Sequence, residues 1–274
     1  MKKTTSCLRD STADTLLLTL YARSIESQKP CPIINDEYAT KLVEQIDYDF
    51  RIFDYIPTTS VGVALRSVHF DKVTSDFISS HKNPIIVIVG CGLDTRKQRL
   101  NKISEQAFFY QLDLPEVISL REQLLPPTTN EKYISGCLLE PEWKDMLLNS
   151  HPDGEFIFLV EGVLMYFTED ENRQFFVQLA ERFHGAELHV DMFNYWMSQN
   201  TAFHEGVSRT QATFKFGVNN EKQIANWHDN LQHEQTWLLS DYPDWHRMGL
   251  PFVSLYLAYY AVRTAVKFIK FTIK

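Results

Sequence analysis

The sequence predicts an α/β protein with a doubly wound, mostly parallel sheet and a helical N-terminal cap. Residues 84–90 form a continuous run rich in Ile and Val, which is typical of a strand buried on both faces. After this run, strand-like and helix-like segments alternate, which favours parallel βαβ units. Before it, apolar side chains recur at helical spacing. We therefore expect a cap in residues 1–81 and a sheet domain in residues 82–274, packed as one compact unit.

Three helices are expected in the cap. The first begins with the run Ser11-Thr12-Ala13-Asp14, which resembles a capping box, and apolar residues follow it at helical spacing as far as Ile25. Cys31-Pro32 interrupts the chain, and a second helix is expected over residues 36–46. A third, amphipathic helix is expected over residues 61–78.

Five strands are expected in the sheet domain, because each is a short apolar run bounded by turn residues. A helix over residues 169–183, ended by Gly185, precedes the last of them. The expected strands cover residues 84–90, 108–112, 132–136, 155–160 and 186–192.

The last third of the chain has a less regular pattern. Residues 234–239 are consistent with a strand, and residues 250–270 with either a final helix or a strand and a short helix. We interpret the latter segment as an amphipathic element that buries Tyr and Phe and leaves its lysines in solvent. Its uncharged stretch, residues 250–262, is too short to span a bilayer, so no membrane insertion is expected.

The composition is that of a folded, acidic protein. Of the 274 residues, 44% are apolar and 13% aromatic, and the formal net charge is −8. This charge argues against nucleic-acid binding, because phosphate recognition needs clustered Lys and Arg. The chain shows no secretion signal. Its four cysteines are widely spaced: Cys7, Cys31, Cys91 and Cys137. They form no zinc-type pattern, so we expect no metal site, and no disulfide scaffold, so we expect a protein of the reducing cytoplasm.

A glycine pair follows the first strand. Gly90 and Gly92 stand where glycine lets the backbone approach a ligand closely, although such a pair can also simply turn a strand into a helix. Asp113 lies 23 residues after Gly90, at the end of the second strand. A carboxylate there can accept hydrogen bonds from both ribose hydroxyls of an adenosine cofactor. Alternatively, Asp113 caps the helix that starts at Pro115. Both roles are compatible, and we favour the ribose role.

The turn departs from the dinucleotide fingerprint. Arg96 occupies the place of the third glycine, which in that fingerprint allows tight helix packing under a pyrophosphate. The sequence therefore favours S-adenosylmethionine, an adenosine ligand without a pyrophosphate, over NAD.

A carboxylate also ends the fourth strand. Glu161 is a solvated strand end, an acid at a helix N-terminus, or a group that holds the cationic amino-acid end of the cofactor. Tyr166, five residues later, is expected either to line the acceptor pocket or to anchor the edge of the core.

Together these segments resemble the leucine carboxyl methyltransferase family, on its polyketide O-methyltransferase branch. The resemblance covers about residues 12–193, and the C-terminal third matches only loosely. The matching blocks are Thr12-Ala13 with Leu20-Tyr21-Ala22-Arg23, Gly62-Val63-Ala64-Leu65-Arg66, residues 89–96, residues 110–115, and Glu161-Gly162-Val163-Leu164-Met165-Tyr166-Phe167.

The resemblance implies a class I, Rossmann-like methyltransferase fold and S-adenosylmethionine as cofactor. It assigns Arg66 to the cofactor carboxylate, whereas the residues alone would place Arg66 on an exposed helix face. Cys137 departs from the family's usual acidic residue over the adenine. The implied cofactor-binding residues are Arg66, Gly90, Gly92, Asp113, Leu114, Cys137, Leu138 and Glu161, and the implied catalytic residue is Tyr166.

The expected reaction is methyl transfer to an oxygen of a small organic acceptor, most simply a carboxylate, which is ionised at pH 7 and needs no general base. A phenol or alcohol would need one, and Tyr166, His189 and Asp191 are candidates by position. The alternatives are a protein C-terminal leucine as acceptor, an NAD-dependent oxidoreductase, and a non-catalytic adenosine-binding protein. An aromatic acceptor pocket or plain core packing is expected from Phe193, Tyr195, Trp196, Phe203 and Phe214. The oligomeric state is left open.

Overall fold

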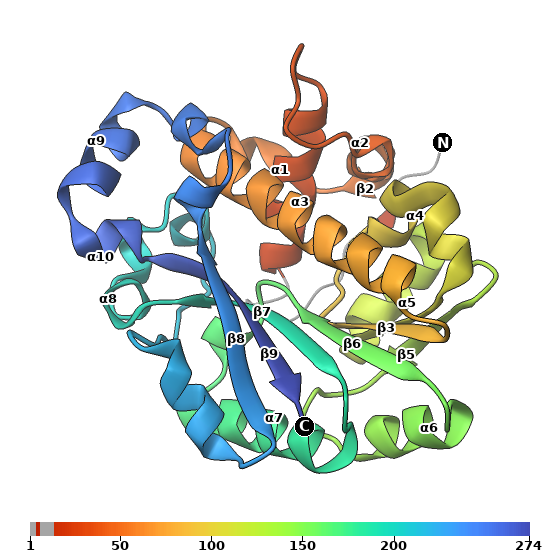
Figure 1. Cartoon of the computed structure of the whole chain (residues 1–274). Helices are drawn as coiled ribbons and strands as arrows, with labels where there is room; N and C mark the ends of the chain where they lie inside the picture. Colours follow the sequence, from red (N-terminus) through yellow and green to blue (C-terminus); the bar gives the residue numbers. More distant parts are fainter. Residues whose placement is uncertain (1–3, 6–13) are drawn as a thin grey trace.

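A seven-stranded sheet forms the centre of the protein, as the computed structural model in Figure 1 shows; residues 4–5 and 14–274 are described. The strand order is β5-β4-β3-β6-β7-β9-β8. The first five strands in this order are parallel, and β9 pairs antiparallel with both β7 and β8. The strands are β3 (Pro84–Val89), β4 (Phe108–Asp113), β5 (Glu131–Ser135), β6 (Glu155–Val160), β7 (Glu187–Phe193), β8 (Leu231–Leu238) and β9 (Val266–Ile273), with β1 (Thr4–Thr5) and β2 (Ile46–Asp47) paired separately.

The doubly wound, mostly parallel sheet predicted from the sequence is confirmed, and all five expected strands are present to within two residues at each end. The prediction succeeds for β3 because all six of its residues are buried, which requires an unbroken apolar run. Strand order reverses between β3 and β6, so the carboxyl ends of these two strands mark the topological switch point of the sheet.

The three helices expected before the sheet, and the helix expected before its fifth strand, are all present. Asp14 opens α1, and the rest of the expected capping box lies outside the described residues. The helix expected over residues 169–183 has the capping box Thr168/Glu171 at its start. The helices are α1 (Asp14–Ser27), α2 (Glu37–Gln45), α3 (Pro57–Ser80), α4 (Arg96–Leu100), α5 (Pro115–Leu124), α6 (Glu142–Ser150), α7 (Glu169–Arg182), α8 (Tyr195–Ser198), α9 (Leu250–Ala258) and α10 (Tyr260–Arg263).

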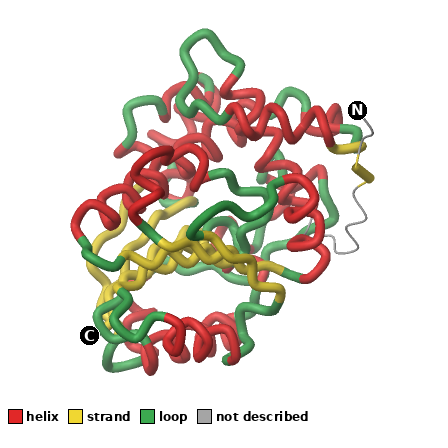
Figure 2. Tube along the Cα trace, turned by 90° about the vertical axis from the view of Figure 1, so that its right-hand side faces the viewer, coloured by secondary structure: helices red, strands yellow, loops and turns green. Residues whose placement is uncertain are grey.

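Helices cover both faces of the sheet, as the turned view in Figure 2 shows. Helices α6 and α7 pack on one face through side chains such as Trp143 and Phe176. Helix α3 packs on the other face, where Phe70 and Phe77 contact the core around Ile86. Helices α1 and α2 share a third apolar cluster with residues that follow β3 and β6. Helices α1 and α2 thus pack on the loops beyond the sheet's carboxyl edge, while α3 is one of the layers that cover the sheet.

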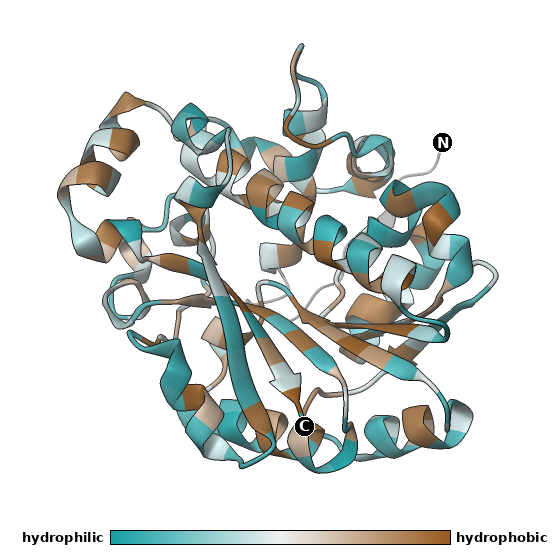
Figure 3. Ribbon diagram, viewed as in Figure 1, coloured by the Kyte–Doolittle hydropathy of each residue, from teal (hydrophilic) through white to brown (hydrophobic). Residues whose placement is uncertain are grey.

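The C-terminal third consists of a strand, two short helices and a final strand. Our interpretation of residues 250–270 as an amphipathic element with buried aromatics and solvated lysines holds for Tyr256 and Phe268, which are buried, and is wrong in two respects. Tyr259 and Tyr260 are exposed, and the brown residues of α9 stand at the margin of the molecule in Figure 3. Lys267 is buried, because β9 is an interior strand and the ammonium pairs with Glu221 at 2.5 Å. In the described residues, no helix has both the length and the apolar character needed to cross a membrane.

Candidate active site

All nine site residues expected from the sequence line one cavity of about 490 Å³ at the carboxyl edge of the sheet. This volume lies within the range of small-molecule and cofactor pockets. The walls come from the loops after β3, β4, β5 and β6, from α1 and α3, and from the segment 211–215. The predicted residues on it are Arg66, Gly90, Gly92, Asp113, Leu114, Cys137, Leu138, Glu161 and Tyr166.

The glycine turn after β3 has a backbone that few other residues adopt. Gly90 has φ +70°, and a Cβ built on it would lie 2.3 Å from a methyl carbon of Val163. Glycine at position 90 is therefore required by its positive φ and by the close approach of Val163 from the loop after β6. The turn is held from below by Arg121 of α5, whose guanidinium donates to the carbonyls of Gly92 at 3.0 Å and Asp94 at 2.8 Å.

Asp113 bridges the glycine turn and the loop after β4. One carboxylate oxygen accepts from the backbone N–H of Gly92 at 2.7 Å, and the other from that of Leu114 at 2.8 Å. The alternative role as a helix cap is wrong, because Leu114 is the N-cap residue of α5. A carboxylate has about four lone-pair positions, so each oxygen of Asp113 keeps one for a ligand. Burial raises the pKa of Asp113 above its ordinary value.

Arg66 lies inside the site and not on an exposed helix face. Its guanidinium donates to Glu161 and to Asp191, each at 3.0 Å, and so joins α3 to the ends of β6 and β7. Gly162 makes this possible, since a Cβ at that position would lie 3.0 Å from the guanidinium. The backbone N–H of Gly162 in turn donates to Asp191 at 2.6 Å. The Arg66 guanidinium therefore lines the cavity while Glu161 and Asp191 hold it in position.

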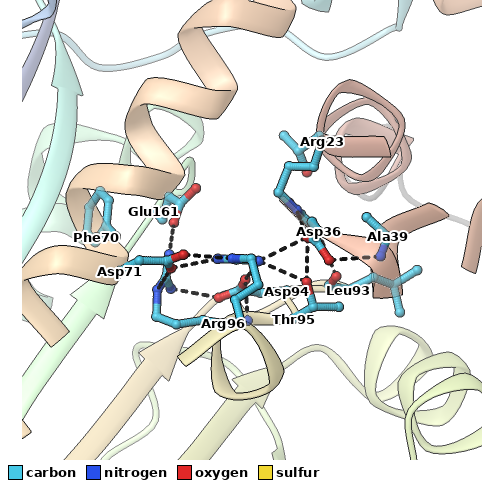
Figure 4. A network of polar contacts seen from close by, with 12 residues as sticks. Arg23, Asp36, Ala39, Phe70, Asp71, Leu93, Asp94, Thr95, Arg96 and Glu161 are labelled. Carbon is cyan, nitrogen blue, oxygen red and sulfur yellow. Dashed lines mark hydrogen bonds and ion pairs between the residues drawn. The ribbon is translucent and has the colours of Figure 1, made fainter. Parts of the chain in front are cut away.

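Arg96, which the sequence analysis noted only as a missing glycine, is the centre of the polar network beside the cavity (Figure 4). Its side chain is 0% exposed and donates to three carboxylates: Asp71 at 2.9 Å, Asp94 at 2.6 Å and Glu161 at 2.5 Å. A buried guanidinium is tolerated only when it is paired in this way. The side chain that replaces the third glycine therefore ties α3 and β6 to the cofactor turn.

The network continues to the two N-terminal helices. Arg99 pairs with Asp71 at 2.7 Å and with Asp36 at 3.1 Å, and Asp36 also accepts from Arg23 at 2.9 Å. In Figure 4, Asp36 lies between Arg23 and Thr95, whose hydroxyl donates to it at 2.6 Å. The whole network holds four arginines and five carboxylates. The members are Arg23, Arg66, Arg96, Arg99, Asp36, Asp71, Asp94, Glu161 and Asp191. When all of them are ionised, the network carries a net charge of −1, which favours a cationic ligand.

Sequence reasoning missed most of this network. Asp71 and Arg99 stand on helices whose exposed faces normally carry such side chains, and Asp36 is the N-cap residue of α2, a position where aspartate is common in solvent. No local pattern marks the three as buried. The available signal was the density of charge in the segment 94–99, where an aspartate and three basic residues directly follow the glycine turn.

The carboxylates of the site differ in proton affinity. Burial alone would raise the pKa of Glu161, but Arg96 and Arg66 outweigh burial and hold that pKa below its usual range. Asp94 is held low in the same way by Arg96 and Arg99. For Asp191, burial outweighs the attraction of Arg66 and raises the pKa.

Tyr166 lines the cavity and its ring lies 5.7 Å from that of Phe214. Burial raises the pKa of Tyr166 to about 12, although a hydrogen bond with Thr15 acts in the opposite direction. The phenol is therefore protonated at neutral pH. Tyr166 is suited to orient an acceptor by hydrogen bonding and not to remove a proton from it.

The other two candidate bases are occupied or remote. Asp191 is held by Arg66 and by the N–H of Gly162. His189 does not line the cavity; it bonds Glu187 at 3.0 Å and lies near the rings of His69 and Trp237. No histidine in the described part of the chain lines the cavity.

The aromatic acceptor pocket expected after β7 is not formed. Phe193 and Phe214 pack against each other, with ring centroids 4.5 Å apart, in the cluster shared with α1 and α2, so core packing is the correct alternative. Tyr195 and Phe203 are exposed. The cavity is instead lined by Gln211, Thr213 and Lys215, the exposed positions of an extended segment that alternates with buried Ala212, Phe214 and Phe216.

The described residues contain no group of three or more His, Cys, Asp or Glu side chains that could hold a metal ion.

The sheet order and the cavity at the switch point define the class: this is the fold of the class I S-adenosylmethionine-dependent methyltransferases. Two solved structures share it. A proposed methyltransferase from Thermobifida fusca superposes with a TM-score of 0.59 at 12% identity, over 92% of this chain and 94% of the other. A protein from Streptomyces avermitilis also has a TM-score of 0.59, at 10% identity, over 97% and 100% of the two chains.

The chain belongs to the leucine carboxyl methyltransferase family, whose sequence model matches residues 17–180. It is 24% identical to the tetracenomycin polyketide synthesis O-methyltransferase of Streptomyces glaucescens, over 84% of each chain. It is 26% identical to an S-adenosyl-L-methionine-dependent methyltransferase of Gibberella zeae, over 84% of this chain and 83% of that one. The family and the cofactor predicted from the sequence are confirmed, and the NAD-dependent alternative is wrong.

Proposed function

We propose that this protein transfers the methyl group of S-adenosylmethionine to a carboxylate oxygen of a small organic acid. The observation that carries the proposal is that every carboxylate among the described residues of the cavity is already engaged, and Tyr166 is protonated. Asp94 and Glu161 are ion-paired, and Glu171 accepts the bonds of the α7 capping box. Asp113 accepts two backbone N–H groups, and its remaining lone pairs are assigned to the ribose. A carboxylate acceptor is already ionised at pH 7, so it needs none of them.

The residues of the cavity fit the cofactor. S-adenosylmethionine supplies an electrophilic methyl group on a sulfonium cation. Asp113 keeps one free lone pair on each oxygen for the ribose hydroxyls, and Arg66 offers its guanidinium to the amino-acid carboxylate. Leu114, Cys137 and Leu138 line the same cavity and would contact the adenine. Alignment of acceptor oxygen, methyl carbon and sulfur by such a site accounts for about 7–11 kcal/mol of a barrier.

The cavity wall formed by the segment 211–215 suits a polar, anionic acceptor. Gln211 and Thr213 offer hydrogen bonds, and Lys215 is an exposed cation on the cavity lining without an ion pair to any described residue. The O-methyltransferase relative supports oxygen as the acceptor atom. Since one relative acts in polyketide synthesis, small organic acids form the first panel to test.

The test is a transfer assay with S-adenosylmethionine labelled in the methyl group. The panel contains small organic acids, matched alcohols and phenols, and a peptide that ends in leucine, with products identified by mass spectrometry. We expect labelled esters, which mild alkali hydrolyses with release of labelled methanol. Alkali-stable methyl ethers would contradict a carboxylate acceptor. Transfer to the peptide alone would assign the protein-methylating reaction instead.

A further inference from the structure

Lys144 is a buried cation close to the cofactor cavity. It stands in the first turn of α6, its side chain is 0% exposed, and no carboxylate of the described chain lies within ion-pair distance. Its ammonium donates to the carbonyl of Leu138 at 2.7 Å and to that of Glu140 at 2.9 Å. The ammonium also lies 4.3 Å from the ring of Trp143. A charge without a counter-ion in such a position is costly to bury, so its contacts require an explanation.

Both carbonyls belong to the loop 136–140, which connects β5 to α6. Gly136, Cys137 and Leu138 of this loop line the cavity. The loop has three further backbone contacts: the N–H of Gly136 donates to the carbonyl of Asp113 at 3.0 Å, that of Cys137 to the Glu140 carboxylate at 3.1 Å, and that of Glu140 to the carbonyl of Cys137 at 3.1 Å. The side chain of Leu138 packs on the core of the sheet. Lys144 therefore ties the far end of the loop to α6.

The glycine turn after β3, which also lines the cavity, is held in the same manner by a different cation. Arg121 donates to the carbonyls of Gly92 and Asp94 in the glycine turn, as Lys144 does to those of the β5 loop. An arginine stays charged at every physiological pH, whereas a buried lysine readily loses its proton. The two walls thus differ in how their anchors respond to pH.

The surroundings of Lys144 favour loss of its charge near neutrality. Burial, together with the cation of Arg182 on α7, lowers the pKa of Lys144 to about 7. Cys137 from the loop, together with Asp145 and Glu142 on α6 itself, acts in the opposite direction. A hydrogen bond from an ammonium is roughly twice as strong as one from a neutral donor.

We propose that Lys144 is a positioning residue for the cofactor: its ammonium holds the loop 136–140 against the adenosine end of the cavity, so cofactor affinity depends on the charge of this side chain. The inference rests on the proposed cofactor arrangement. It adds Lys144, a residue outside the cavity wall, to the residues that determine cofactor affinity. It also implies that the anchoring of the loop 136–140 depends on pH, whereas the anchoring of the glycine turn by Arg121 does not.

The first test is calorimetry of S-adenosylhomocysteine binding at pH 6 and pH 8.5. We expect the wild type to bind about tenfold more weakly at the higher pH, where the two hydrogen bonds lose their charge. Lys144→Met should bind about tenfold more weakly at both pH values, and Lys144→Arg should bind with little dependence on pH. Lys132→Met, at an exposed lysine of β5, is the matched control and should follow the wild type.

The second test follows the loop without the cofactor. Iodoacetamide labelling of Cys137, relative to exposed Cys31 in the same sample, reports how firmly the loop is held. We expect this ratio to rise several-fold in Lys144→Met. If that variant does not fold, Lys144→Arg and the wild-type pH profile decide.

The two proposals fail in different ways. A wild type that binds no S-adenosylhomocysteine contradicts the proposed cofactor arrangement, and the labelling ratio still tests the anchor. Binding that is the same in the wild type and in both Lys144 variants at each pH, with an unchanged labelling ratio, contradicts the role of Lys144 alone.

Discussion

Asp113 uses only half of its hydrogen-bonding capacity inside the protein. Its two oxygens each accept one backbone N–H, from Gly92 and Leu114, and these bonds orient the carboxylate toward the cavity. The same residue therefore shapes the glycine turn and leaves acceptor positions for a ribose. Because burial raises its pKa, the negative charge on Asp113 is less stable than on a solvated aspartate, and a partner that donates hydrogen bonds would stabilise it.

We expect Asp113→Asn to weaken S-adenosylhomocysteine binding by about 10- to 100-fold, because hydrogen bonds to a charged acceptor contribute about 1.5–3 kcal/mol. Calorimetry at pH 7 measures the effect. Glu122→Gln, at an exposed position of α5, removes one carboxylate from the same helix and should leave the affinity unchanged. Equal affinities for the two variants would remove Asp113 from the cofactor site.

At the scale of elements, arginines join parts of the chain that share no backbone hydrogen bonds. Arg96 connects α4 to α3 through Asp71 and to the end of β6 through Glu161. Arg66 connects α3 to the ends of β6 and β7. The position of α3 relative to the switch point is thus determined by ion pairs at one end and by the apolar contacts of Phe70 and Phe77 along its length.

We expect Arg96→Met to lower the free energy of unfolding by about 3–5 kcal/mol, because it leaves buried carboxylates without their partner. Urea denaturation at pH 7 measures the change. Arg51→Met removes an exposed pair with Asp49 and should lower the free energy of unfolding far less than Arg96→Met does. Similar losses for the two variants would show that the buried network contributes no more than a surface pair.

At the scale of the whole molecule, burial of histidines makes the fold sensitive to acid. Burial lowers the pKa of His69 to about 3 and that of His204 to about 4. His69 belongs to α3, and its ring is stacked on that of Phe268 in β9. The ring is also bonded to the hydroxyl of Tyr242 at 2.6 Å. Below pH 6.5 the unfolded chain binds protons at these positions and the folded chain does not, so stability falls as the pH falls toward 4.

We expect the free energy of unfolding of the wild type to fall between pH 6.5 and pH 4.5 more steeply than that of His69→Gln. The difference in slope should be about 1.4 kcal/mol per pH unit, the contribution of one histidine that stays neutral in the fold. Urea denaturation across this range gives the slopes. His246→Gln, at an exposed histidine, should retain the wild-type slope, and parallel profiles for His69→Gln and the wild type would contradict the assignment.

The sequence was sufficient for the features that depend on local pattern. The buried strand β3 required an unbroken apolar run, the turn at Gly90 required a residue that tolerates positive φ, and Asp113 was marked by its place at the end of β4. Periodicity did not place residues 250–270, because an interior antiparallel strand buried Lys267 while the apolar side chains of α9 stayed exposed.

By itself, then, the sequence determined the parallel strands of the sheet and the family, because these follow from local pattern and from the order and spacing of the family's blocks. Spacing also marked Gly90, Gly92, Asp113 and Glu161, whereas Arg66, Cys137 and Leu138 came from the family resemblance. Only the tertiary structure decided which charged residues are buried and paired. Asp71, Arg99 and Lys144 belong to ordinary helices and Asp36 caps one, and their roles depend on partners brought close by folding. The physical reason is that the cost of burying a charge depends on its surroundings in space, which local sequence does not specify.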